Sequence, residues 1–303
     1  MMHTKTLARI APYLLGAALA AMAVPAAKAA PFPPITSPAS QEHRPGKLIW
    51  ADLFSSKPDA AATFYCSLLG WTSDSVDHKG RSYIILSNAG SPVAGVVMRR
   101  KQADDKPSRW IGYLSVYDLS ATLASVEKNG GKVHARARDF PNRGFQAIIG
   151  DNEGNAIGLL QSASGDPIDD MTPPGGWNWF ELYVSNPQDS ANFYQAALGY
   201  SAAPETHADR KSEFVLSSEG ANRAGIAPIP ADATGASPSW LGVIRVADLD
   251  QTLAKVPQLG GTVQVAPRSA EYGSRFAIIA DPTGGEIGLV QYVDSDTNPA
   301  KSP

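Results

Sequence analysis

Cysteine is almost absent from the sequence. The 303 residues include one cysteine, Cys66, so an intramolecular disulfide is excluded. Cys66 stands in AATFYCSLLG, whose apolar spacing predicts a helix, and no histidine lies near it in the sequence. Reactive thiolates need a cationic setting, so we expect a buried structural thiol and not a nucleophile.

The motifs of several large enzyme classes are also lacking. The sequence has no G-x-G-x-x-G, no G-x-x-x-x-G-K-[ST] and no G-x-S-x-G. Nucleotide-binding loops and serine hydrolases therefore lose their usual signatures, and we expect no cofactor. No catalytic residue is predicted.

Long hydrophobic runs are lacking, apart from one near the start. Residues 10–24 are mostly apolar, follow two basic residues and precede the sequence AKA, which ends at Ala29. This arrangement predicts a signal peptide at 1–29. Pro12 interrupts the run, which is shorter than the ~20 residues of a membrane anchor. We expect a periplasmic or secreted protein after cleavage near Ala29.

A surplus of positive charge is missing as well. Cleavage would remove three basic and no acidic residues, which changes the formal charge from −3 to −6. Nucleic acid and anionic membrane surfaces are poor partners for this balance. We expect a small organic molecule as the partner, and the sequence leaves a homodimer open.

The chain contains a long internal repeat. DNEGNAIGLLQ (151–161) returns as DPTGGEIGLVQ (281–291), and IWADLFSSKPDAAATFYCSLLGW (49–71) matches NWFELYVSNPQDSANFYQAALGY (178–200). Turn-rich segments with few apolar residues separate and flank the two copies. The expected organisation is a leader at 30–46, a first domain at 47–162, a linker at 163–176, a second domain at 177–293 and a tail at 294–303. We expect extended ends and two domains that fold separately.

Each copy has the pattern of a strand, a helix and three strands, twice over. In the first copy the helices are expected at 58–69, where Pro58 suits a first turn, and at 119–129, before a Gly-Gly stop. Four βαβββ units per chain predict an α+β fold.

This organisation resembles the vicinal oxygen chelate superfamily, the glyoxalase, bleomycin-resistance and dioxygenase proteins. The resemblance rests on Phe-Tyr near the end of the first helix of each copy, on Leu-Gly-Trp or Leu-Gly-Tyr after it, and on the DNEG and DPTG turns. It covers nearly all of the chain after the leader. It implies tandem glyoxalase-like domains, each with two βαβββ modules that form a half-open barrel.

Members of this superfamily commonly hold a divalent metal on the inner face of the barrel, through two histidines and one glutamate. The corresponding positions here are Trp50, Ile111 and Gly158 in the first copy and Trp179, Leu241 and Gly288 in the second. None of these side chains can bind a transition metal. We therefore expect no metal.

Alternation along the first strand of each copy predicts what lines the inner face. The predicted ligand-binding residues are Trp50, Asp52 and Phe54 in the first copy and Trp179, Glu181 and Tyr183 in the second. Two aromatic rings beside a carboxylate suit a small ligand with a donor or cationic group. The second copy is preferred because glutamate reaches further. The alternative is a plugged barrel whose acids pair with an arginine such as Arg99 or Arg275.

The sequence thus favours an exported tandem protein that binds a small organic molecule without a metal. Two alternatives stay open: a lyase, isomerase or dioxygenase of the same fold that holds a metal elsewhere, and a scaffold that binds a protein partner.

Export makes a first testable prediction. The protein recovered from a periplasmic or culture fraction should begin at Ala30, or within about two residues of it, because signal peptidase cleaves after small residues. N-terminal sequencing checks this. An intact Met1 in soluble cytoplasmic protein would contradict it.

Overall fold

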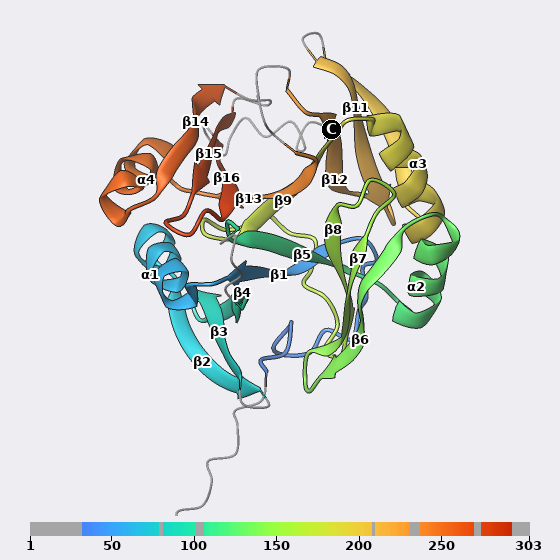
Figure 1. Cartoon of the computed structure of the whole chain (residues 1–303), viewed down its shortest axis with the longest axis horizontal. Coiled ribbons are helices and arrows are strands. Elements are labelled where there is room, and N and C mark those ends of the chain that lie inside the picture. Colours follow the sequence, from blue (N-terminus) through green and yellow to red (C-terminus); the bar gives the residue numbers. More distant parts are fainter. Residues whose placement is uncertain are drawn as a thin grey trace, which may run out of the picture.

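The computed structural model describes residues 32–78, 81–100, 106–207, 210–230, 237–269 and 274–292. The predicted signal peptide and the tail at 294–303 lie outside these residues. Two eight-stranded sheets and four α-helices make up the described part (Figure 1). None of the described helices is long and apolar enough to cross a membrane.

The first sheet takes all its strands from the first copy. In chain order its elements are β1 (Leu48–Ser55), α1 (Pro58–Leu69), β2 (Thr72–His78), β3 (Arg81–Asn88), β4 (Ser91–Met98), β5 (Arg109–Ser115), α2 (Leu119–Lys128), β6 (Lys132–Phe140), β7 (Gly144–Gly150) and β8 (Ala156–Ser162). The strand order is β2-β3-β4-β1-β5-β8-β7-β6.

The second sheet repeats this plan with the second copy. Its elements are β9 (Trp177–Val184), α3 (Pro187–Leu198), β10 (Ser201–His207), β11 (Arg210–Ser218), β12 (Ala221–Pro228), β13 (Ser239–Arg245), α4 (Leu249–Lys255), the 3-10 helix η1 (Pro257–Leu259), β14 (Thr262–Ser269), β15 (Ser274–Ala280) and β16 (Glu286–Tyr292). The strand order is β10-β11-β12-β9-β13-β16-β15-β14.

Both sheets join two βαβββ modules along a central antiparallel pair, β1 with β5 and β9 with β13. The first strand of each module pairs in parallel with the last, as β1 does with β4. The outermost strands of a sheet, such as β2 and β6, do not pair with each other, so the sheets stay open. The predicted α+β fold of two half-open barrels is confirmed.

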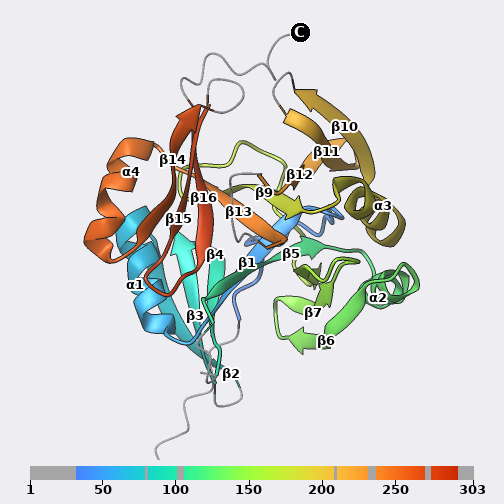
Figure 2. The same ribbon diagram turned by 45° about the horizontal axis from the view of Figure 1, so that its top comes forward.

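The hydrophobic cores do not follow the two sheets. One core joins the helix side of the first module to that of the fourth, so Leu53 and Phe64 pack with Ile279 and Leu289. The other core joins the second and third modules. Figures 1 and 2 show the result: α1 lies beside α4, and α2 lies beside α3. Each core is therefore shared between the copies.

The Phe-Tyr pair of each copy makes this contact specific. Tyr65 on α1 donates a hydrogen bond to Asp281 of the second copy at 3.0 Å, and Tyr194 on α3 donates to Asp151 of the first at 3.1 Å. Both aspartates are buried and also accept bonds from the backbone of their own turns, for example from the N–H of Gly285. Burial, and then the nearby carboxylate, raise the pKa of both tyrosines, so both stay protonated donors.

The phenylalanines explain the second glycine of each Gly-Gly pair. A Cβ at Gly261 would lie 2.7 Å from the ring of Phe64, and one at Gly131 would lie 3.0 Å from the ring of Phe193. These glycines leave room for a ring from the other copy. Their role is therefore packing between the copies as well as helix termination.

Two expectations are not supported by the structure: an extended leader, and copies that fold separately. The leader is not merely extended, because Phe32 and Ile35 are buried against the first sheet. The linker packs on the leader through Ser164 and the fully buried Asp166, which accepts a bond from the backbone N–H of Arg44. The shared cores likewise argue against separate folding of the two copies, since each core is incomplete without residues of the other copy.

Shared cores predict one cooperative unfolding transition for both copies. Tyr65→Phe leaves the buried Asp281 without a donor from the other copy, and should cost about 1–3 kcal/mol in the free energy of unfolding. Tyr117→Phe is the control: Tyr117 is 57% exposed, so its loss should change stability by about 0.5 kcal/mol or less. Urea denaturation measures both. Two separate transitions, only one of them shifted by Tyr65→Phe, would contradict the shared cores.

Candidate functional site

The inner face of the first sheet is filled with side chains. Trp50 and Asp52 on β1 are 1% and 3% exposed, so a ligand cannot reach them in this conformation. Phe54, the third predicted residue, is half-buried in the same cluster. In this copy the packing favours the plugged barrel over the open pocket.

A dense network surrounds Asp52. The indole N–H of Trp50 donates to its carboxylate at 2.7 Å, and the hydroxyls of Tyr83 and Tyr113 donate to it as well. Burial raises the pKa of both tyrosines, which keeps them protonated. Gly95 on β4 makes this possible, because a Cβ there would lie 2.5 Å from the Asp52 carboxylate.

Sequence reasoning missed the cation of this face. Arg143, in the turn before β7, is fully buried, and its guanidinium carbon lies 3.9 Å from the centre of the Trp50 ring. The arginines suggested by the sequence are elsewhere: Arg275 pairs with the exposed Asp250, and Arg99 bonds the carbonyl of Lys106. No local pattern marks Arg143, because its place depends on a turn between two strands.

The leader closes the first face. Phe32 contacts the rings of Tyr83 and Phe140 edge to face, at centroid distances of 5.0 and 5.2 Å. Figure 1 shows this segment in blue, between β3 and β6. The first sheet is preceded in the chain by the leader, which packs on its inner face. The second sheet is preceded by the linker, which packs on the leader.

The inner face of the second sheet holds the same kind of residues in a more open setting. Trp179, Glu181 and Tyr183 on β9 are all partly exposed, and their neighbours in the chain point into the core. The indole N–H of Trp179 donates to Glu181 at 2.7 Å. A Cβ at Gly225 would lie 2.3 Å from this carboxylate, so glycine again makes room for the acid.

The metal positions of the superfamily are unsuited to a metal in both sheets. At Gly158 a Cβ would lie 2.3 Å from the ring of Tyr113, and at Gly288 it would lie 2.7 Å from the ring of Phe276. An aromatic ring thus occupies the space that a glutamate would need. Among the described residues, no three His, Cys, Asp or Glu side chains cluster as metal ligands. The residues present do not fit the metal.

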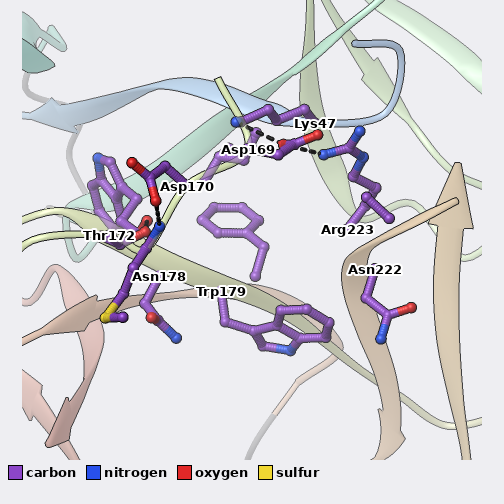
Figure 3. A pocket seen from close by; sticks show the side chains of 13 residues that line it. Lys47, Asp169, Asp170, Thr172, Asn178, Trp179, Asn222 and Arg223 are labelled. Carbon is purple, nitrogen blue, oxygen red and sulfur yellow. Dashed lines mark hydrogen bonds and ion pairs between the residues drawn. The ribbon is translucent and has the colours of Figure 1, made fainter. Parts of the chain in front are cut away.

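A pocket of about 440 Å³ lies beside Trp179, where the start of the first domain, the linker and the second sheet meet (Figure 3). Asp169 of the linker lies at its edge and bonds Lys47 at 2.8 Å and Arg223 at 2.6 Å. Burial raises the pKa of Asp169, but the bonds from Arg223 and Lys47 outweigh this and lower it to about 2. Glu181 does not line this pocket.

Cys66 is half-buried, whereas the sequence predicted a buried thiol. Its side chain packs against the edge of the core formed by the first and fourth modules. Burial raises the pKa of the thiol, which disfavours the thiolate and agrees with a structural role.

Comparisons with known proteins agree with this architecture. The anthracycline biosynthesis proteins DauV of Streptomyces sp. (strain C5) and DnrV of Streptomyces peucetius are each 29% identical over 263 residues, 82% of this chain and 94% of theirs. A Mn(II)-bound glyoxalase from Novosphingobium aromaticivorans superposes with a TM-score of 0.57 at 17% identity, over 83% of each chain. The 2,3-dioxygenase LapB from Pseudomonas sp. KL28 gives 0.56 at 16%, over 86% of this chain and 95% of its own. At these identities the two structures show the fold alone.

The family assignment rests on the sequence itself. The profile of the glyoxalase/bleomycin resistance protein/dioxygenase superfamily matches twice, over residues 47–159 and 176–289. Each match covers the strands and helices of one sheet. This chain is therefore a tandem member of the glyoxalase/bleomycin resistance protein/dioxygenase superfamily.

Proposed function

We propose that the protein binds a planar aromatic molecule at the inner face of the second sheet, against Trp179, Glu181 and Tyr183. One observation carries the proposal: Trp50 and Asp52 are sealed in the first sheet, whereas Trp179 and Glu181, at the same positions of the second, are partly exposed. An exposed indole offers a stacking surface, and the carboxylate beside it accepts hydrogen bonds.

The surroundings of Trp179 support a ligand of this kind. Phe276, which is partly exposed, adds a third ring to the face. The pocket of about 440 Å³ shares Trp179 with this face but is not lined by Glu181 or Tyr183, so it provides room at the indole end of the site. The related proteins DauV and DnrV are named for anthracycline biosynthesis. Anthracyclines combine fused planar rings with hydroxyl and amino donors, which suit stacking on Trp179 and bonding to Glu181.

The proposal includes metal-free binding and export. Metal-free binding is supported by the rings of Tyr113 and Phe276, which take the space of the missing ligands. Export is supported by the basic start, the apolar run and the cleavage motif that ends at Ala29. An alternative with a metal at this face would need ligands that these positions do not supply.

The proposal predicts a loss of affinity on Glu181→Gln. Removing the charge should weaken a charge-assisted bond of about 1.5–3 kcal/mol, which is roughly a ten- to hundredfold loss. Fluorescence titration with doxorubicin, an anthracycline, measures it, with the exposed Glu219→Gln as the matched control. If Glu181→Gln and Glu219→Gln bind doxorubicin as the unaltered protein does, the proposed site is wrong.

The contrast between the two sheets gives a second prediction. Asp52→Asn changes a fully bonded, buried carboxylate and should lower the free energy of unfolding by about 1–3 kcal/mol, while Glu181→Gln should change it little. Thermal melting without ligand compares the two. Equal destabilisation would mean that Glu181 is a structural partner and that the second face is plugged like the first.

A further inference from the structure

Arg143 has unsatisfied hydrogen-bond donors in the sealed face of the first sheet. Its Nη1 donates to the hydroxyl of Tyr83 at 2.8 Å, but Nε and Nη2 are buried and have no partner. The side-chain nitrogen of Gln146, which is 5% exposed, also has none. Buried donors without partners cost about 1–3 kcal/mol each, so such groups mark a place that an acceptor fits.

The Asp52 carboxylate does not accept a hydrogen bond from these nitrogens. Asp52 accepts bonds from the indole of Trp50 and from two tyrosine hydroxyls. The guanidinium of Arg143 contacts two aromatic rings. Its carbon lies 5.0 Å from the centre of the Phe32 ring and 3.9 Å from that of the Trp50 ring. Phe32 thus satisfies the stacking preference of the guanidinium but none of its free donors.

Phe32 belongs to a segment with a separate anchor. Downstream of it, Thr36 and Ser40 bond to Ser164 and Asp166 of the linker. None of these bonds involves the ring of Phe32, so a rotation of that side chain alone would leave them in place. The side chain, and not the whole leader, is the part that a ligand must displace.

We propose that the inner face of the first sheet is a second binding site, for a planar aromatic carboxylate, which Phe32 occupies in the ligand-free protein. The ring of the ligand takes the place of the Phe32 ring over Arg143. Its carboxylate accepts from Nε and Nη2 of Arg143, the two-donor geometry that guanidinium groups offer to carboxylates, and from the amide of Gln146.

The second face has the opposite preference. At the repeat offset, Gly273 and Phe276 stand where the first copy has Arg143 and Gln146, so these two positions supply neither the cation nor the amide. The first site would take an acid, and the second a donor or a cation. This inference does not depend on the proposed function, because it uses none of the residues on β9.

Phe32→Ala tests the site by leaving the space of one benzene ring. Benzoate should bind this variant at least tenfold more tightly than it binds the unaltered protein, and at least tenfold more tightly than benzyl alcohol binds the variant, because only benzoate accepts from both Arg143 nitrogens. Isothermal titration calorimetry measures all three affinities. In the background of Phe32→Ala, Arg143→Met should remove the preference for benzoate and leave the binding of benzyl alcohol.

Two results would overturn the proposal. A folded Phe32→Ala protein that binds benzoate no better than the unaltered protein has no such site. Equal affinity for benzoate and benzyl alcohol would mean a plain apolar hole in which Arg143 plays no part.

A measurement on the intact leader covers the case in which Phe32→Ala fails to fold. With 4-fluorophenylalanine at position 32, saturating benzoate should move the fluorine resonance from its buried position to that of a solvent-exposed ring. Benzoate binding that saturates without moving this resonance would also refute displacement of Phe32.

Discussion

The reciprocal contact between the copies is the constraint on which the rest of the structure depends. Each Phe-Tyr pair reaches into the other copy, where the tyrosine meets a buried aspartate and the phenylalanine fills the space over a glycine. Trp110 and Trp240 extend the two contacts by donating to Tyr65 and Tyr194 at 2.9 and 3.0 Å. The helix sides of all four modules are buried in these shared contacts. The inner faces of the sheets are therefore the places where the two copies are free to differ.

The two inner faces differ in what surrounds their carboxylates. In the first, tyrosines, an arginine and the leader enclose Asp52. In the second, Val243 and Phe276 stand where the first has Tyr113 and Gln146, and Glu181 is partly exposed. A buried carboxylate is tolerated only with several donors, which the first face supplies.

Much of the fold could be predicted from the sequence because its signals are local. The helix 58–69 was predicted with the bounds that the structure has, and the helix 119–129 to within one residue, since proline, glycine and apolar spacing mark them. The sharing of cores could not be predicted, because a repeat says that two units are alike and not which surfaces meet. Arg143 and the inserted Phe32 were missed for a related reason: both reach the site from turns or irregular segments, where periodicity gives no direction for a side chain.

The anchoring of the leader has a consequence for the order in which the chain assembles. Residues 36–47 are held by linker residues 164–169, and Asp169 is in turn held by Arg223 on β12. A chain made from its N-terminus presents the leader first, but the groups that fasten it appear only after the whole first copy, and the last of them only with the second sheet. The anchors that hold the leader over the first inner face can therefore form only after the first copy and the linker have been made, and Asp169 gains its partner Arg223 later still.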